Sequence, residues 1–329
     1  MSLNRFGLLI ISALPVALFA AASHAAPTCT QHVPAAPALK RLQEVMATGR
    51  FVAYQPTSLQ VINGVLTQVD ADSIKRDLQV LRPYFDGLIT YGSNNGAAGI
   101  ADVAATLGYR ALIMGVWDID NQQEIDAAIA AARRHPQLVV GISLGNERLF
   151  AKQASALQLS QALEKLRKQV PRLALTTTEP FHIFLEPGTA TIMRASDFML
   201  VNVHPIFEPW FRTAPDANAA EFVVNVVGKM HAVACGPVLV KETGVPTAPA
   251  AMGYTPQRQA GFYQALQQKF KPSAQAAFAY FSAFDAPWRV RDVSPVPGVH
   301  PEEAYFGLFD EQRKPKLVMQ KISPLKTSL

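Results

Sequence analysis

Apolar and polar positions along the chain predict a regular alternation of strands and helices. Segments whose apolar residues recur every three or four positions, as on one face of a helix, separate short apolar runs that suit buried strands. The predicted strands are 51–54, 87–91, 110–116, 138–147, 173–178, 198–203, 238–242 and 276–284. The predicted helices are 39–46, 73–81, 100–107, 121–136, 159–170, 222–230 and 255–270. Asn121 and Glu124 resemble a capping box, and 181–195 is the connection with the least regular helical pattern.

Eight strands that alternate with helices are typical of the α/β class and of a (β/α)₈ TIM barrel. We therefore expect a single barrel domain over 26–329, with the tail 305–329 covering its outside. A doubly wound sheet is the structural alternative, but its dinucleotide-binding form needs a glycine-rich first turn. Here the first predicted strand is followed by Gln55, Pro56 and Thr57.

The N-terminal 25 residues have the pattern of a secretory signal peptide. Arg5 provides the positive start, 8–22 the apolar stretch, and Ser23-His24-Ala25 the cleavage site. A membrane anchor is the alternative, but the stretch is interrupted by Pro15 and no basic cluster follows it. We expect a secreted or periplasmic protein that does not remain inserted in a membrane.

Composition adds limits on partners. The 30 basic and 25 acidic residues give a net charge of +5, which is far from a nucleic-acid-binding surface. The two cysteines, Cys29 and Cys235, leave two possibilities open: one disulfide in an oxidising compartment, or two unpaired buried thiols. No metal-ligand spacing is present, so we expect no metal and no cofactor, and we expect a monomer.

Two glutamates stand where a barrel enzyme keeps its chemistry. Glu147 and Glu242 end the fourth and seventh predicted strands, close to glycines, and the carboxyl ends of barrel strands meet at one mouth. Period-two alternation points both side chains toward the barrel axis and leaves Lys241 outside. Alternation also sends Asn146 outward, so a role for Asn146 requires a β-bulge at the strand end.

Two facing carboxyl groups, without metal ligands or a nucleophilic serine or cysteine, suit the hydrolysis of an acetal. One stays protonated to release the leaving oxygen, while the other is ionised and attacks or stabilises the oxocarbenium-like centre. The alternative for each glutamate taken alone is a structural carboxylate in a salt bridge.

Gly145-Asn146-Glu147 and the run 242–246, Glu-Thr-Gly-Val-Pro, resemble the signature of glycoside hydrolase family 17, the β-1,3-glucanases and β-1,3-glucan transglycosylases. Further matches fall in family order along most of the mature chain: 91–93, 115–117, 178–179, 202–205, 284–289 and 306–309. The resemblance implies a retaining barrel glycosidase that binds β-glucan chains.

The resemblance implies that Glu147 is the general acid/base and Glu242 the nucleophile. It also implies that Asn146 hydrogen-bonds the sugar 2-hydroxyl and that Tyr91 lies close to the nucleophile. The remaining candidates for substrate binding are Tyr54, Trp117, Glu179, Asn202, His204, Asp285 and Trp288. The aromatic ones could stack on sugar rings, although ordinary packing stays open for Trp117 and His204.

Three departures from the family pattern bear on substrate preference. Ala286, Arg289 and Val245 stand where the family usually has Glu, Lys and Trp, and Glu302 or Glu303 could supply the missing acid. Three hypotheses result: a β-1,3-glucan hydrolase, a transglycosylase, or a non-catalytic glucan-binding barrel in the cell envelope.

Overall fold

The computed structural model describes residues 29, 31–291 and 299–326, and the predicted signal peptide lies outside them. Eight strands form a closed barrel in the order β1-β10-β9-β8-β7-β6-β5-β4, in which all neighbouring pairs are parallel. They are β1 Phe51–Ala53, β4 Gly87–Ile89, β5 Ala111–Val116, β6 Val139–Asn146, β7 Ala174–Pro180, β8 Met199–Asn202, β9 Val238–Glu242 and β10 Ala276–Tyr280. The predicted barrel and its eight strands are confirmed.

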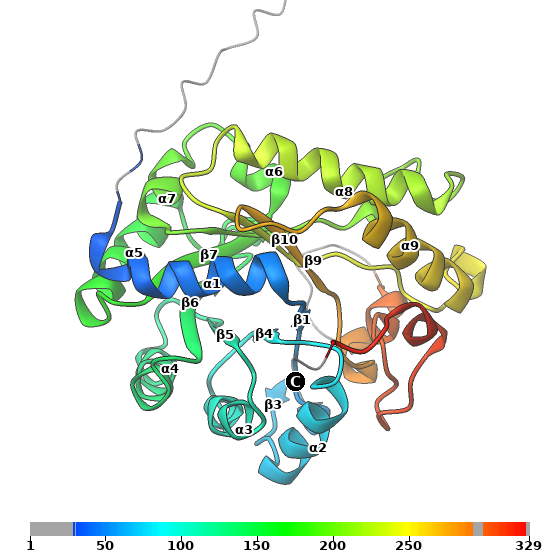
Figure 1. Cartoon of the computed structure of the whole chain (residues 1–329), viewed down its shortest axis with the longest axis horizontal. Helices are drawn as coiled ribbons and strands as arrows, with labels where there is room; N and C mark the ends of the chain where they lie inside the picture. The colour runs from blue at the N-terminus through cyan, green and yellow to red at the C-terminus, as the bar shows by residue number, and fades with distance from the viewer. Residues whose placement is uncertain (1–28, 30, 292–298, 327–329) are drawn as a thin grey trace, which may run out of the picture.

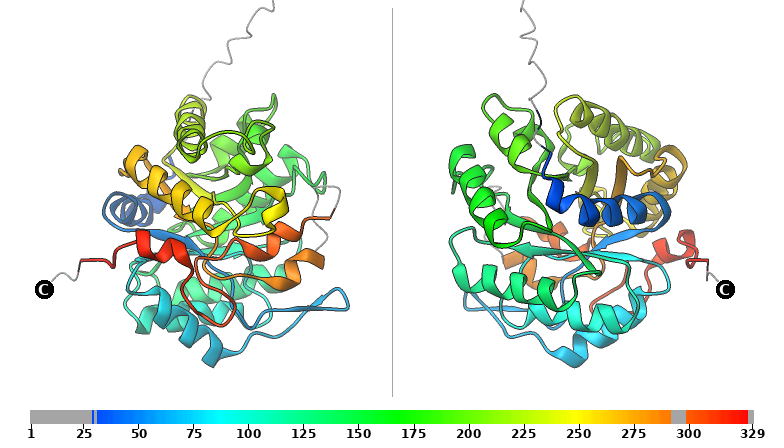
Figure 2. Two further views of the ribbon diagram at one scale, coloured as in Figure 1. Left: turned by 90° about the vertical axis from the view of Figure 1, so that its right-hand side faces the viewer. Right: turned by 60° about the vertical axis from the view of Figure 1, so that its left-hand side comes forward.

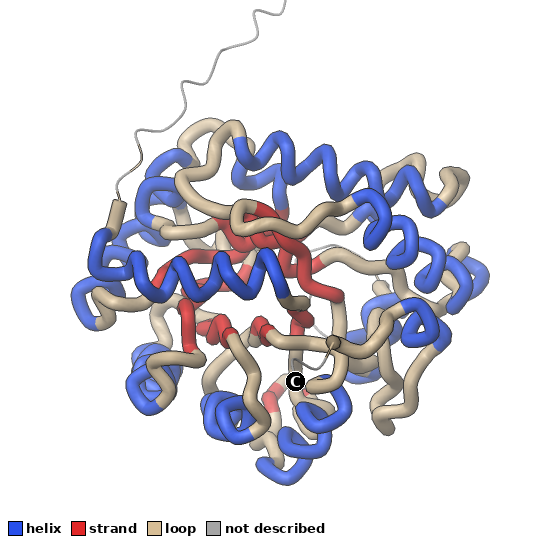
Figure 3. Tube along the Cα trace, in the orientation of Figure 1, coloured by secondary structure: helices blue, strands red, loops and turns tan. Residues whose placement is uncertain are grey.

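Helices surround the barrel, as Figures 1 and 3 show. They are α1 Ala36–Thr48, α2 Ala71–Leu81, α3 Ile100–Thr106, α4 Gln122–Arg134, α5 Ala156–Gln169, α6 Phe181–Phe184, α7 Ala190–Ala195, α8 Asp216–His231 and α9 Pro256–Lys269. The region of weak pattern, 181–195, contains two short helices instead of one long one. Short 3₁₀ turns complete the described chain: η1 Val33–Ala35, η2 Ala97–Gly99, η3 Pro205–Phe207, η4 Ala250–Met252, η5 Pro287–Arg291, η6 Pro301–Tyr305 and η7 Leu317–Lys321.

Side-chain caps fix several helix starts. Asp70 accepts hydrogen bonds from the Asp72 and Ser73 amides at α2, and Thr255 accepts one from the Arg258 amide at α9. Asn121 accepts from the Glu124 amide as predicted. The reciprocal half of that capping box is not formed, because the Glu124 carboxylate accepts from the Ser93 amide at 2.9 Å.

A small hairpin that was not predicted, β2 Val61–Ile62 with β3 Val65–Leu66, projects from the body of the molecule (Figure 2). Asn63 and Gly64 form its turn, both with positive φ (53° and 77°). An Asn-Gly pair between apolar residues is a strong hairpin signal, so the sequence did contain this information.

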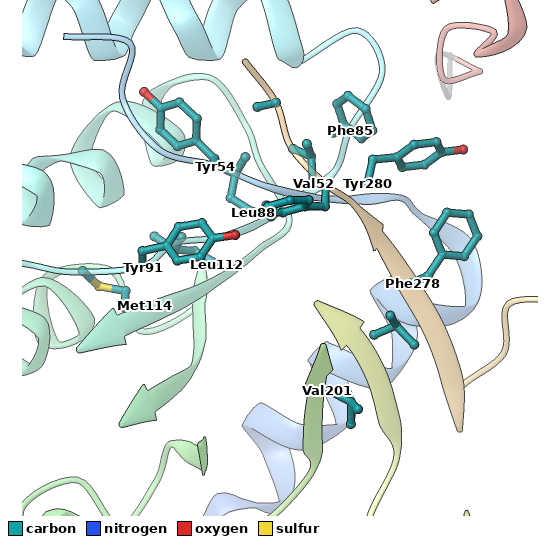
Figure 4. Close-up of a cluster of buried hydrophobic side chains, with 14 of the residues drawn as sticks. Val52, Tyr54, Phe85, Leu88, Tyr91, Leu112, Met114, Val201, Phe278 and Tyr280 are labelled. Atoms are coloured by element: carbon teal, nitrogen blue, oxygen red, sulfur yellow. The ribbon is translucent and has the colours of Figure 1, made fainter. Parts of the chain in front are cut away.

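Two apolar clusters lie on the two faces of the barrel wall. One lies between the strands and the surrounding helices, and Figure 4 shows part of it. The other takes residues from all eight strands, among them Phe51, Ile113 and Leu239, and adds Leu42 and Met46 of α1. Among the described helices only α1 contributes to this second cluster, so it is the barrel interior. Helix α1 therefore closes the barrel at the amino ends of the strands, and it crosses in front of them in Figure 1.

Long-range contacts hold the two chain ends against the barrel. Cys29 and Cys235 form a disulfide, with 5.3 Å between their Cα atoms, which resolves the open question about the cysteines. The C-terminal tail was expected to cover the outside of the barrel. At Arg313 it does so, because Arg313 Nε donates to Asp77 of the outer helix α2 at 2.7 Å. Earlier in the tail, Phe309 forms a bridge with Phe284 beyond the end of β10, so 306–309 contributes to the mouth of the barrel.

Candidate active site

Glu147 follows a distorted strand end. The register of β6 against β7 shifts between Ser143 and Asn146, which leaves an extra residue in β6. Gly145 has φ 85° there, a conformation that suits glycine. Glu147 itself has φ 54°, which is rare for a residue with a side chain. The bulge that Asn146 requires is present, and it lets both side chains reach the barrel mouth.

The expectation for β9 was wrong about Lys241. Leu239 belongs to the interior cluster, whereas Val238 and Val240 pack against the helices. Alternation from Leu239 therefore points Lys241 inward, and its side chain is only 2% exposed. A register shift against β8 pairs Val201 with Val240 but Asn202 with Glu242, so Glu242 also reaches the mouth. Both faces of β9 are apolar, and the sequence alone could not distinguish them.

Glu242 lies among cationic groups. His204 Nε2 is 3.2 Å from Glu242 Oε2, and Lys241 Nζ is 3.6 Å from Glu242 Oε1. Burial acts to raise the pKa of Glu242, but the hydrogen bond from His204 and the charges of Lys241, His204 and Arg289 outweigh it and lower the pKa to about 2. Glu242 is therefore ionised at neutral pH.

Glu147 has the opposite electrostatics. Burial and the negative charge of Glu242 raise the pKa of Glu147, and a hydrogen bond from Asn202 Nδ2 to Glu147 Oε1, at 2.8 Å, only partly opposes them. Asn202 pairs with Glu242 in the register of β8 against β9 and donates to Glu147, so the two carboxyl groups lie in one site. The environment therefore moves the pKa values of the pair apart, so one carboxyl can be protonated while the other is ionised.

His204 joins the pair to an aromatic wall. Its ring contacts those of Phe207, Phe281 and Phe306 edge-on, with centroids 5.6, 5.2 and 6.0 Å away. Burial acts to lower the pKa of His204, but the hydrogen bond to Glu242 and the charge of Glu242 raise it overall. Phe207 was not a sequence candidate. It is 49% exposed, so one aromatic face beside the pair remains open.

Two buried polar atoms of the site have no hydrogen-bond partner within the described residues: Asn202 Oδ1 and His204 Nδ1. Buried polar atoms are nearly always paired. Tyr91 lies close to the pair, because Lys241 Nζ is 4.1 Å from the centre of its ring. Its hydroxyl interacts with Glu242 and Arg289, and burial and the charge of Glu242 raise its pKa. Unpaired donors and acceptors around the two carboxyl groups suit the hydroxyl groups of a ligand.

Arg289 and Glu303 extend the site toward the C-terminal part of the chain. The Arg289 guanidinium lies 5.4 Å from the centre of the Tyr91 ring, and Arg289 donates to Gln55 Oε1 at 3.0 Å. Burial raises the pKa of Glu303, while the charges of Arg289 and His204 act against it. Glu302 instead lies 2.8 Å from His300 Nδ1. Of the two acids considered as a replacement for the missing family glutamate, Glu303 is thus the one that interacts with the site.

Other candidates serve the scaffold around the site. Tyr54 is fully buried and donates to Asp77 Oδ2 at 2.9 Å, and Figure 4 shows its hydroxyl pointing in a different direction from that of Tyr91. The structure therefore does not bring Tyr54 to the pair. Glu179 accepts from the Leu149 and Phe150 amides at 2.8 and 3.2 Å, which fixes the loop after Glu147. Burial raises the pKa of Glu179 to about 7 despite these bonds.

Asp285, Trp288 and Trp117 differ in their surroundings. Asp285 accepts from Lys316 Nζ at 2.7 Å and from the Gly307 amide at 2.8 Å. Burial raises the pKa of Asp285 to about 6 even so. Asp285 and Trp288 line a cavity of about 210 Å³ together with Arg289, whereas Trp117 is 47% exposed. The cavity adjoins the pair through Arg289, and Trp117 presents a free aromatic surface.

Within the described residues, no group of three or more His, Cys, Asp or Glu side chains could hold a metal ion. In the same part of the chain, no helix is long and apolar enough to cross a bilayer.

Solved structures with the same fold include several glycosidases. A β-1,3-glucanosyltransferase of glycoside hydrolase family 17 from Rhizomucor miehei is 21% identical, with 81% of this chain and 94% of that one covered and a TM-score of 0.62. An endo-laminarinase from Formosa Hel1_33_131 is 18% identical, with 84% and 87% covered and a TM-score of 0.67. At these identities the similarity establishes the fold.

Sequence comparisons agree with the motifs. A glucan 1,3-beta-glucosidase of Arthroderma benhamiae is 24% identical over 268 residues, which cover 75% of this chain and 84% of that protein. A probable beta-glucosidase, btgE, of Emericella nidulans is 29% identical over 157 residues, which cover 46% of this chain and 27% of that protein. The family described as the BtgE/BtgC glycoside hydrolase domain matches residues 52–307. The chain therefore belongs to the BtgE/BtgC glycoside hydrolase family, which confirms the glycosidase resemblance of the motifs.

Proposed function

We propose that this glycoside hydrolase cleaves β-1,3-linked glucose chains with retention of configuration, and that Glu147 and Glu242 carry out the reaction. The main support is the buried pair itself: the carboxyl groups of Glu147, just after β6, and of Glu242, the last residue of β9, whose pKa values are moved in opposite directions. The similarity to a glucan 1,3-beta-glucosidase supports the choice of substrate.

In the first step, the ionised Glu242 attacks the anomeric carbon while Glu147 donates its proton to the leaving oxygen. The glycosidic C–O bond breaks and a glucosyl ester of Glu242 forms. His204 and Lys241 favour the ionised nucleophile, because they lie 3.2 and 3.6 Å from its carboxylate. The Asn202 amide holds Glu147 at 2.8 Å, which orients the acid toward the shared space.

In the second step, Glu147 is a carboxylate and takes a proton from the incoming hydroxyl, whose oxygen displaces Glu242. If water is that acceptor, the products are shorter chains. A sugar hydroxyl would give longer ones. Transfer is therefore the second candidate, and the open face of Phe207 beside His204 supports it, because an acceptor ring could stack there.

A non-catalytic glucan-binding barrel was the third hypothesis. The charge arrangement around Glu147 and Glu242 argues against it, because lost activity would remove the need for two coupled buried carboxyl groups at one site. We also propose that residues 1–25 are removed as a signal peptide and that the enzyme works outside the cytoplasm as a monomer. The Cys29–Cys235 disulfide supports an oxidising compartment.

The test is incubation with laminari-oligosaccharides of defined length, with products separated by size and the first-formed anomer read by NMR. Shorter products with the β-anomer formed first are expected, and longer products as well would establish transfer. The α-anomer would contradict retention. Cello-oligosaccharides are the linkage control, and unchanged laminari-oligosaccharides would contradict the proposed substrate.

A further inference from the structure

Lys241 is a buried cation that joins two non-adjacent strands across the barrel mouth. It is the penultimate residue of β9, and its Nζ lies 2.6 Å from Asn146 Oδ1 at the end of β6, while β7 and β8 separate the two strands in the sheet. The same Nζ lies 4.1 Å from the centre of the Tyr91 ring. With Glu242 at 3.6 Å, these contacts offset the cost of burying an ammonium group.

The contact with Lys241 determines which way the Asn146 amide faces. A lysine side chain in its charged form only donates hydrogen bonds, so the atom that it contacts must be the amide oxygen. The NH₂ group of Asn146 then points away from Lys241. Asn146 is only half-buried, and its amide nitrogen makes no hydrogen bond within the part of the chain that the structure describes. Both of its N–H groups are therefore available to a ligand.

We infer that Lys241 is a positioning residue that locks the Asn146 side chain with its NH₂ group toward the sugar, and thereby sets how strongly the enzyme recognises the 2-hydroxyl. This inference rests on the proposed function, because it needs a glucosyl ring at the Glu147–Glu242 pair. Without Lys241, the amide can rotate and present its oxygen as often as its nitrogen. The hydrogen bond from the Asn146 NH₂ group to the sugar 2-hydroxyl, which strengthens toward the transition state, is then absent for much of the time.

The first test compares Lys241→Met with the unmodified enzyme on two substrates. One is 4-nitrophenyl β-laminaritrioside, and the other lacks only the 2-hydroxyl of the ring that carries the aryl group. We expect kcat/KM for the hydroxylated substrate to fall by about 30-fold, within the range of a lost transition-state hydrogen bond. On the deoxy substrate the loss should be within about threefold.

A purely structural role, or an effect only on the charge of Glu242, would lower both rates by the same factor, and that result would overturn the inference. Lys316→Met is the matched control, because Lys316 is a partly buried lysine that, like Lys241, lies beside a carboxylate at the barrel mouth. This control should leave the ratio of kcat/KM for the hydroxylated substrate to kcat/KM for the deoxy substrate unchanged.

The second test is a double-mutant cycle with Asn146→Ala. If Lys241 acts through Asn146, Lys241→Met should cost at most about twofold more once Asn146 is an alanine. Independent losses that multiply would contradict the inference. If the unmodified enzyme does not cleave the hydroxylated substrate, the proposed function fails instead, so the two failures are distinguishable.

Rescue gives a third test that does not depend on how well the methionine variant folds. In Lys241→Cys the new cysteine carries the one free thiol available for alkylation, because the two native cysteines form the disulfide. Alkylation with 2-bromoethylamine in denaturant, followed by refolding, restores an ammonium group on a chain of nearly lysine length. The modified protein should recover the 2-hydroxyl preference, and a preference that stays lost in folded, fully alkylated protein would count against the inference.

Discussion

The two ends of the barrel treat buried charge in different ways. At the amino end, Asp197 accepts hydrogen bonds from His32, Arg167 and the Leu175 amide at 2.8, 3.0 and 2.7 Å. At the carboxyl end, Glu242 lies beside His204 and Lys241, while His204 Nδ1 and Asn202 Oδ1 have no hydrogen-bond partner within the described residues. Both oxygens of Asp197 accept hydrogen bonds within the protein, although Arg167 Nε has no partner within the described residues, whereas the carboxyl end leaves two groups beside the proposed pair for a ligand to satisfy.

The backbone shows the same contrast. Helix α1 and the apolar interior cluster close the amino end, and the disulfide ties Cys29 to Cys235 just before β9. At the carboxyl end, register shifts occur in both strands that carry the proposed pair, and Glu147 has a left-handed backbone. Strained backbone and unpaired polar groups lower stability, so they are retained mainly where they serve a function. We therefore expect residues at the amino end of the barrel to contribute mainly to stability, and those at the carboxyl end mainly to the proposed reaction.

The largest expected effect comes from removing the proposed nucleophile. Glu242→Gln should lower turnover of laminari-oligosaccharides by at least about 10⁴-fold, because a neutral amide cannot replace the attacking carboxylate. Circular dichroism and oligosaccharide binding should stay close to those of the unmodified protein. Turnover within tenfold of normal would remove Glu242 from the role of nucleophile.

The next effect separates the proposed acid from a glutamate that only holds backbone. Glu147→Gln should lower turnover of natural chains by about 10²–10⁴-fold, and by much less for the first step on substrates with activated leaving groups. The matched variant Glu179→Gln keeps the same change of charge in a carboxyl that accepts from backbone amides. It should cost less than about tenfold. Equal losses of turnover in the two variants would contradict the assignment of Glu147 as the acid and Glu179 as a structural residue.

At the amino end the expected loss is in stability. Asp197→Asn removes the charge that pairs with Arg167 and leaves that cation buried, which should lower the free energy of unfolding by about 3–5 kcal/mol. Turnover per folded molecule should stay within about twofold. Chemical denaturation and initial rates at a low temperature measure the two quantities, and a variant that loses turnover but keeps its stability would break the comparison.

The smallest expected effect is a shift in the pH dependence. Activity needs ionised Glu242 and protonated Glu147, so kcat/KM should fall on the acid side as Glu242 is protonated and on the alkaline side as Glu147 ionises. Because the pKa of Glu242 is lowered to about 2 and that of Glu147 is raised, the two limbs should lie well apart. In His204→Asn the acid limb should move up by about one pH unit, because Glu242 loses its strongest ionising contact. An unmoved acid limb would show that His204 does not set the charge of Glu242.

The sequence was sufficient for the fold because local periodicity carries that information. Strands and helices were visible as apolar runs and apolar stripes, and eight such pairs leave few topologies other than the barrel. It also marked Glu147 and Glu242 as charged residues at strand ends, where a carboxylate is costly without a purpose. The Asn63-Gly64 hairpin was equally visible in the sequence, since its signal is local.

Only the tertiary structure decided which side chains meet. Tyr54 and Tyr91 look alike in the sequence, yet Tyr54 turns to Asp77 of α2, while Tyr91 lies under Lys241. Lys241 was expected to point outward, because β9 is apolar on both faces and strict alternation cannot represent a register shift. Its contact with Asn146 joins residues 95 positions apart. Such contacts depend on barrel closure and on irregularities at strand ends, and neither leaves a periodic trace in the sequence.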